Sequence, residues 1–252
     1  MIYHILNGDA LAYSFADAKM EGNIIVVREA LVDGNVSGND LQAFWHSRAK
    51  HIGVTETEYQ EKVASEFEKI INAPGDSEFN LWFEYDLFCQ VNSWFVISLI
   101  NSLQAKKKVY AVYTSYLDKT DQHFWNGFGP ANAGQLQSCF ADRMLLSDAD
   151  LHLGKELWTA YKASNFKALN HLAKIQSTAF PYLQEVVQAH IDRFPSDGSK
   201  GRPEKVIEEI ITTVSTNFPT VCKEFWKRES IYGFGDTQVK QLYDKVIQDR
   251  KN

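Results

Sequence analysis

The sequence predicts an α/β fold, with a Rossmann-like open parallel sheet of about four strands at the N-terminus and a mostly α-helical C-terminal region. Two observations support this prediction. Short apolar runs alternate with segments of helical spacing over residues 1–116, which is the pattern of parallel strands joined by right-handed crossovers. From residue 135 onward the sequence shows helical spacing and no convincing strand.

Four runs are expected to be strands because they are rich in β-branched and aromatic residues and are apolar on both faces, as in a sheet covered by helices. They are IYHILN (2–7), NIIVVRE (23–29), FNLWF (79–83) and VYAVYT (109–114). Helices are expected between and after these strands at 11–20, 41–52, 55–72 and 87–105. Thr55 and Glu58 form a capping-box pattern at the start of the third helix, and Pro74-Gly75 ends it.

The chain changes character after Tyr116. A connector rich in Gly, Asn and Asp (117–134) is followed by helical segments at 135–143, 148–163, 165–175, 182–194, 203–214, 219–229 and 236–249. We therefore divide the chain into a sheet domain (1–116), the connector and a helical region (135–252). Within that region, we expect residues 200–252 to form either a small winged-helix-like unit that contacts phosphates or a packing module. The eight acidic residues of the segment favour the packing module.

Charge and hydropathy indicate which partners to expect. The net charge of -6 argues against nucleic acid and anionic membrane surfaces as partners. Residues 87–103 carry no charge, but Gln, Asn and Ser interrupt them, so a helix buried against the sheet is favoured over a membrane span. The N-terminus has neither the basic region nor the long apolar region of a signal peptide.

Cysteine usage indicates a reducing compartment. Cys89, Cys139 and Cys222 are far apart and form no CxxC pair, which is typical of a cytoplasmic protein and gives no zinc motif from cysteine spacing. We interpret Cys89 as a core residue at a helix start.

Six short motifs carry a family resemblance: HILNGDA (4–10), REALVDGNV (28–36), LWFEYD (81–86), ELWTAYKASNF (156–166), FPYLQEVVQAHIDRFP (180–195) and YGFGDTQVKQLYDKV (232–246). In this order they resemble an uncharacterised bacterial family, the domain-of-unknown-function family eighteen-thirty-five. The resemblance covers most of the chain but not residues 114–134, and Phe234 stands where the family pattern has Leu. It implies no activity, because the family has none assigned.

Polar residues follow each predicted strand, where an open parallel sheet binds its ligands. They are Asn7, Gly8 and Asp9 after the first strand; Arg28, Glu29 and Asp33 after the second; Glu84 and Asp86 after the third; and Thr114 and Ser115 after the fourth. We expect these groups to meet at one edge of the sheet. Glu84 and Asp86 are expected on the exposed rim rather than in the core.

The residue types indicate the ligand chemistry. Asp9, Glu84 and Asp86, with Glu29, offer the oxygen ligands that Mg²⁺ or another hard divalent cation takes. Arg28 provides a fork for phosphate or carboxylate, and the Gly8-Asp9 turn before a helix provides backbone N–H groups for an anion. The sequence therefore favours a small-molecule site for a phosphorylated or nucleotide-like ligand, with no reaction defined.

Structural roles compete with each of these assignments. Asp9 and Asp86 precede helices, where Asp is a common N-cap. Arg28, next to Glu29, is also typical of a residue that forms a salt bridge with a rim carboxylate, and Asp33-Gly34 is typical of a tight turn. The alternative function is a non-enzymatic regulatory or interaction protein that acts through its helical C-terminal region, since the chain carries no recognised catalytic motif.

Overall fold

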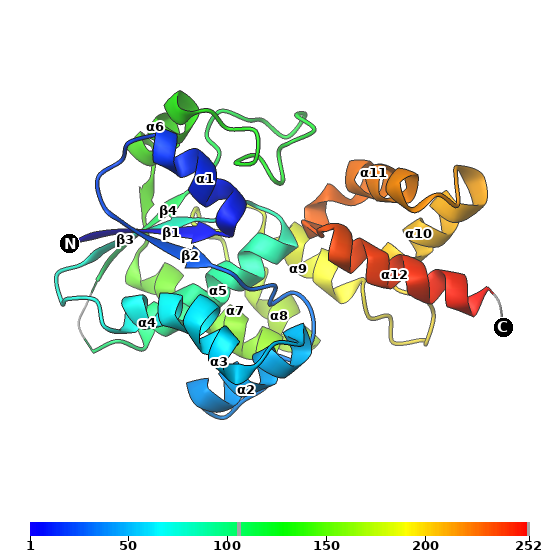
Figure 1. Ribbon diagram of the computed structural model, residues 1–252, viewed down its shortest axis with the longest axis horizontal. Coiled ribbons are helices and arrows are strands. Elements are labelled where there is room, and N and C mark those ends of the chain that lie inside the picture. Colours follow the sequence, from blue (N-terminus) through cyan, green and yellow to red (C-terminus); the bar gives the residue numbers. More distant parts are fainter. Residues whose placement is uncertain (105–106, 251–252) are drawn as a thin grey trace.

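The computed structural model describes residues 1–104 and 107–250 and has a five-stranded sheet surrounded by helices (Figure 1). The strand order is β2-β1-β3-β4-β5, and all neighbouring pairs are parallel except β4 and β5. The strands are β1 (Ile2–Asn7), β2 (Asn23–Val27), β3 (Glu78–Trp82), β4 (Lys108–Val112) and β5 (Met144–Leu145). The predicted α/β class, with its N-terminal parallel sheet and helical C-terminal region, is confirmed.

Strand β5 was not predicted, so the expectation of no strand after residue 135 is wrong. It pairs antiparallel with the edge strand β4, with Tyr110 opposite Leu145 and Ala111 opposite Met144. A two-residue strand is too short to show an alternating pattern in the sequence. Its conformation comes from the free hydrogen-bonding edge that β4 presents.

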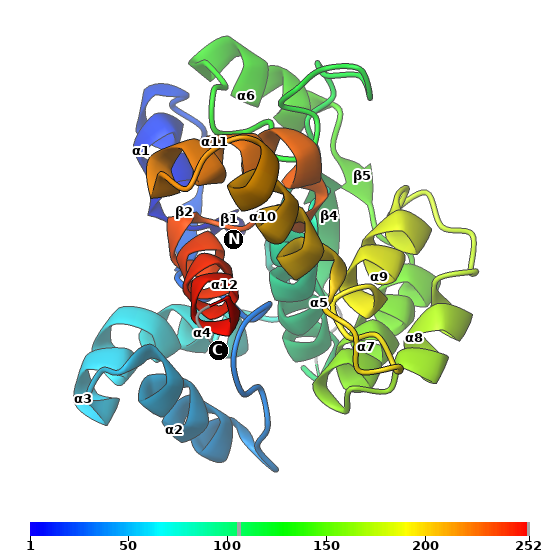
Figure 2. The same ribbon diagram turned by 90° about the vertical axis from the view of Figure 1, so that its right-hand side faces the viewer.

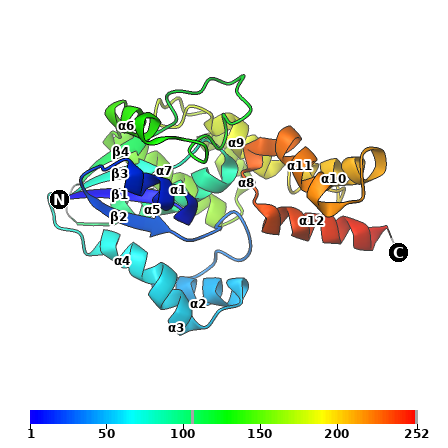
Figure 3. The ribbon, with the colours of Figure 1, turned by 45° about the horizontal axis from the view of Figure 1, so that its top comes forward.

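Helices cover both faces of the sheet (Figures 1 and 3). On one face, α1 (Asp9–Asp17) and α6 (Ala133–Ala141) pack on Leu6, Trp82 and Val112. On the other face, the neighbouring strand residues Ile5, Leu81 and Ala111 belong to a larger core. That core holds α4 (Ser65–Ile71), α5 (Leu87–Asn101) and, beyond α5, α7 (Asp148–Lys162). This alternation explains why the strands are apolar throughout.

Most predicted helices end within a few residues of the observed ones. The predicted helix 87–105 is α5, which is buried along most of its length and ends at Asn101; residue 105 lies outside the described residues. The predicted helix 55–72 is a continuous stretch of α3 (Glu56–Tyr59), a π-helical turn (Gln60–Ala64) and α4. Thr55 caps it by accepting the N–H of Glu58. The other helices are α2 (Leu41–Ile52), α8 (Phe166–Leu172) and α9 (Leu183–Ile191).

The last part of the chain forms a unit of three helices that lies beyond the carboxyl ends of the parallel strands. These are α10 (Arg202–Thr213), α11 (Phe218–Glu229) and, after a 3₁₀ turn (Ser230–Tyr232), α12 (Asp236–Asp249). Figure 2 shows them in front of β1 and β2. Residues 200–250, all of them described, contain no strand, so the unit lacks the wing of a winged helix. Among the described helices, none has the length and apolar character needed to cross a bilayer.

Candidate functional site

The strand order fixes where a ligand crevice is expected. From β1 the chain passes to β2 on one side, then returns across β1 to β3 on the other side. The helices that follow β1 and β3, α1 and α5, consequently lie on opposite faces of the sheet. In doubly wound sheets, ligands bind outside the carboxyl ends of the strands at such a switch point.

A pocket of about 480 Å³ lies beyond the ends of β1 and β2. Its lining comes from the two strand ends, from α2, from the start of α5 and from α12. The lining residues are Asn7, Gly8, Val27, Arg28, Glu29, Ala30, Asp33, Arg48, His51, Ile52, Phe88, Thr237, Gln238 and Gln241. Helix α12 therefore completes a pocket whose other walls come from the N-terminal half of the chain.

Five of the eight predicted ligand-binding residues line this pocket: Asn7, Gly8, Arg28, Glu29 and Asp33. Asp9 is not in the lining but is bonded to Arg28, which is. Glu84 and Asp86 do not line it; they form a separate cluster with Cys89. The three predicted cation ligands therefore do not lie together: Asp9 is beside Arg28 at the pocket, whereas Glu84 and Asp86 are in the cluster with Cys89.

Glu29 has a buried structural partner, Arg48, whose side chain has no exposure to solvent. The guanidinium donates to both carboxylate oxygens of Glu29 at 2.7–3.2 Å. Its remaining donors go to the main-chain oxygens of Ala30, Asp33 and Asn35. The pair therefore fixes the loop after β2, which forms one wall of the pocket.

Arg28 is exposed and is held by the exposed Asp9 and the half-buried Glu66. Its Nε lies 2.9 Å from both carboxylate oxygens of Asp9, and its Nη1 lies 3.5 Å from Glu66 and donates to the Lys62 carbonyl. The hydrogen bonds to Asp9 raise the pKa of Arg28, which keeps its charge. The expected salt bridge of Arg28 with a rim carboxylate is formed with Asp9, whereas Glu29 pairs with the buried Arg48.

A chain of amides joins the pocket to the cluster. The N–H of Leu31 donates to Asn92 Oδ1, so Asn92 Nδ2 must be the donor to Glu29 O at 2.7 Å and to Asn7 Oδ1 at 2.8 Å. Asn7 Nδ2 consequently faces Cys89 Sγ at 2.9 Å. These bonds span the switch point, from the end of β1 to the start of α5.

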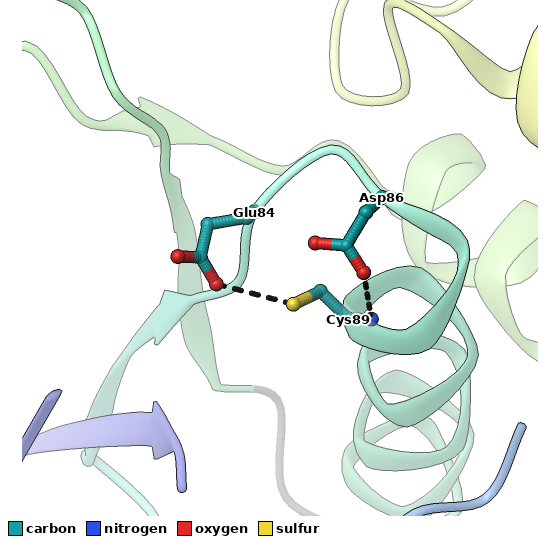
Figure 4. Close-up of side chains that lie close together, drawn as sticks. All are labelled: Glu84, Asp86 and Cys89. Atoms are coloured by element: carbon teal, nitrogen blue, oxygen red, sulfur yellow. Dashed lines mark hydrogen bonds between the residues drawn. The ribbon is translucent and has the colours of Figure 1, made fainter. Parts of the chain in front are cut away.

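Glu84, Asp86 and Cys89 lie together beyond the end of β3 (Figure 4). The thiol of Cys89 donates to Glu84 Oε2 at 3.1 Å, and the N–H of Phe128 donates to Glu84 Oε1 at 3.1 Å. Asp86 caps α5 by accepting the N–H of Cys89 at 2.9 Å. The N-cap interpretation is therefore right for Asp86, whereas Asp9 is the first residue of α1 and caps nothing.

The prediction that Glu84 and Asp86 lie on an exposed rim is wrong. Asp86 is 1% exposed and Glu84 is half-buried. Two distant segments cover them: the connector, through Phe128, and the turn before α12, where a Cβ on Gly233 would lie 1.8 Å from Asp86 Oδ1. Local sequence around the third strand contains no sign of either cover.

Burial sets the protonation of this cluster. It raises the pKa of Glu84, and together with the charge of Glu84 it raises the pKa of Asp86 to about 7. Burial and the two carboxylates also raise the pKa of the Cys89 thiol. A nucleophilic cysteine needs the opposite shift, so the surroundings of Cys89 do not favour covalent catalysis.

Asp33, which also lines the pocket, and the two positions after β4 have structural surroundings. Asp33 forms the expected turn, with its N–H bonded to Ala30 O and Gly34 at φ +74°. Ser115 donates to Asp142 away from the pocket, and Thr114 is buried.

Sequence reasoning missed Arg48, Asn92 and the α12 residues, because a charged or amide residue within a helix gives no sign of what it will face. Cys89 was assigned to the core, and its polar surroundings were not predicted.

Comparisons with protein-family models, with curated proteins and with solved structures find no match to this chain, so the family resemblance of its motifs stays a prediction.

Proposed function

We propose that this protein binds a small phosphorylated or nucleotide-like molecule in the pocket beyond β1 and β2. One observation carries the proposal: the pocket of about 480 Å³ combines an arginine with apolar walls at the carboxyl edge of a parallel sheet. Ligand pockets for small molecules and cofactors have this size, and open parallel sheets bind ligands at this edge.

The lining contains apolar side chains, amides and a helix N-terminus, and each suits a different chemical group of such a ligand. Val27, Ile52 and Phe88 are apolar and suit a base or other flat group. Gln238 and Gln241 of α12 offer amides that both donate and accept. Gly8 lies at the edge, and no side chain caps α1 in the described structure, so the first-turn N–H groups of α1 favour an anion there.

Arg28 is engaged by Asp9 in this structure. The two side chains are 35% and 49% exposed, and exposed pairs contribute only about 0–1 kcal/mol. A ligand phosphate, with its greater charge and three acceptor oxygens, is therefore expected to replace Asp9 at Arg28. In this proposal Asp9 is a competitor for the ligand rather than part of its binding surface.

Thermal unfolding against a panel of nucleotides and sugar phosphates tests the proposal. A compound at 100 times its Kd stabilises the folded protein by about 2.7 kcal/mol. Arg28→Gln should weaken binding by about 10–100-fold, because a charge-assisted contact is lost. Asp9→Asn should strengthen binding by up to about fivefold, because the competing carboxylate is removed.

Arg228→Gln is the matched control, since Arg228 is 33% exposed and is paired with Glu209 and Glu224 on the C-terminal unit. It should leave binding unchanged. The proposal fails if no compound shifts the transition, or if Arg28→Gln binds as wild type does.

The protruding C-terminal unit supports a second candidate, a non-enzymatic interaction protein (Figures 1 and 3). Trp226 on α11 is 40% exposed. However, the basic residues Lys200, Arg228, Lys240 and Lys245 of this unit are paired with carboxylates, which does not favour nucleic acid. An absence of any ligand-induced shift, together with self-association in sedimentation experiments that Trp226→Ser abolishes, would support this candidate instead.

A further inference from the structure

The cluster beside the pocket has the composition and spacing of a metal site. Glu84, Asp86 and Cys89 each present one ligand atom, and these atoms all lie within 4.8 Å of one another (Figure 4). Glu84 comes from the segment between β3 and α5, Asp86 from the N-cap of α5, and Cys89 from the first turn of α5. The three residues are therefore held by the same short segment at the switch point of the sheet.

One atom in the cluster lacks a partner. Asp86 Oδ1 accepts the N–H of Cys89, but Asp86 Oδ2 is buried and has no hydrogen-bond partner in the described part of the chain. Figure 4 shows this oxygen directed toward the space between Glu84 and Cys89. A buried carboxylate oxygen without a partner is costly unless a proton or a cation compensates it.

The charge balance of the cluster calls for such compensation. Three acidic groups meet there, and neither Glu84 nor Asp86 forms an ion pair with any described Lys, Arg or His. The thiol hydrogen of Cys89 bridges to Glu84 Oε2 but brings no positive charge to the cluster. A divalent cation would displace this hydrogen as a proton, offset the negative charge and satisfy the free oxygen of Asp86.

The surroundings also orient the ligand atoms. The N–H of Phe128 holds Glu84 Oε1, which leaves Oε2 facing the thiol. Asn7 Nδ2 donates to Cys89 Sγ, a hydrogen bond that a metal-bound thiolate would also accept, and Asn92 fixes Asn7 in that orientation. Partners of this kind, one step behind the ligands, orient the ligands and tune affinity in known metal sites.

We propose that Glu84, Asp86 and Cys89 bind a divalent cation of the zinc class, with water or a ligand group in the fourth position. The thiolate selects against Mg²⁺ and Ca²⁺, which take oxygen ligands, and favours Zn²⁺ or Co²⁺ with mixed sulfur and oxygen ligands. Oxygen and sulfur ligand atoms around a tetrahedral Zn²⁺ lie about 3.3–3.7 Å apart. Cys89 Sγ and Glu84 Oε2 are already 3.1 Å apart, and all three ligand atoms lie within 4.8 Å of one another, so the inward shift falls mainly on Asp86.

The site is separate from the proposed ligand pocket but shares Asn7 with it. Its occupancy requires no second ligand, so the two proposals can fail independently. The hard-cation site expected from the sequence is replaced here by one that includes sulfur and excludes Asp9.

Zinc and cobalt titrations of the chelator-treated full chain test the proposal. Zn²⁺, measured by competition with a chromophoric chelator, should bind with one equivalent per chain, and its affinity should fall as the pH is lowered because ligand protons are released. Co²⁺ should give a thiolate-to-metal charge-transfer band in the near ultraviolet. Millimolar Mg²⁺ should not displace either ion.

Variants assign the ligands. Cys89→Ser should abolish the charge-transfer band and weaken Zn²⁺ binding by at least about tenfold. Glu84→Gln should weaken Zn²⁺ binding by a similar factor. Asp86→Asn should also weaken binding while retaining the cap on α5, because Asn caps as well as Asp. Cys139→Ser, at a buried cysteine that contacts Ser115 instead, is the control and should change nothing.

The proposal is overturned if wild type binds no stoichiometric Zn²⁺, if the cobalt complex lacks the thiolate band, or if Cys89→Ser binds as wild type does. The first two readouts need no variant, so an unfolded substitution cannot leave the question open.

Discussion

Replacing Arg48 with Met should destabilise the protein strongly, because it leaves the carboxylate of Glu29 buried without a counter-ion. Both side chains have 0% exposure. After the change, Glu29 keeps only the Tyr59 hydroxyl, at 2.6 Å, and the N–H of Ala30 as partners. Breaking a buried pair on one side costs about 3–5 kcal/mol, and the freed carbonyls of Ala30, Asp33 and Asn35 add to the loss.

The assay is urea unfolding followed by circular dichroism, with Glu29→Gln, Arg48→Met and the double variant in one thermodynamic cycle. The double variant should lose less than the sum of the single variants, by about 2 kcal/mol or more, since the uncompensated charge is absent from it. Arg228→Met, at an exposed pair, should cost no more than about 0.5 kcal/mol.

A loss below about 1 kcal/mol for Arg48→Met, or strict additivity in the cycle, would refute this reasoning. It would mean that the loop after β2 keeps its shape without the pair. The wall of the ligand pocket would then owe nothing to Arg48.

Two further predictions concern other parts of the chain. Gly233→Ala should destabilise the protein by about 2–5 kcal/mol in urea unfolding, because Gly233 has φ +61° and an added Cβ would collide with Asp86. The control Gly53→Ala, at φ +81° with open space around the new Cβ, should cost only about 1–2 kcal/mol. Equal losses in the two variants would contradict the docking of the Gly233 turn on Asp86. Burial, with the charge of Arg193, lowers the pKa of His190 to about 3. Between pH 6.5 and about pH 3 the unfolded state therefore binds more protons than the folded state, and the stability of the protein should fall as the pH drops through that window. Between pH 7 and pH 5, wild type should lose about 2 kcal/mol more than His190→Asn, and parallel pH profiles of the two proteins would contradict the assignment.

Much of the fold could be predicted from local sequence because its strands are long enough to show their pattern. The four parallel strands and the residues that follow β1 and β2 were found this way, and five of those residues do share a pocket. Parallel topology alone brings strand ends together, so Asn7 and Arg28 could be placed near each other despite their separation in the chain.

The rest depended on contacts between distant segments. The burial of Glu84 and Asp86 is caused by Phe128 and Gly233, and no pattern near residue 84 predicts those covers. Arg48 lies in a helix with an ordinary charged sequence, yet its guanidinium is fully buried against Glu29. Likewise, Gln238 and Gln241 have the sequence setting of surface residues on a C-terminal helix, and only the fold places α12 over the sheet edge.

The most direct test of the ligand site is a nuclear magnetic resonance titration of the ¹⁵N-labelled chain with the compound that gives the largest thermal shift. We predict that the amides of Gly8, Asp9 and Ala10 and the side-chain amides of Gln238 and Gln241 shift together, with one dissociation constant. Arg28→Gln should remove these shifts at the same concentration. Shifts confined to the exposed faces of α10 and α11, with Gly8 and Gln241 unmoved, would mean that the ligand binds elsewhere.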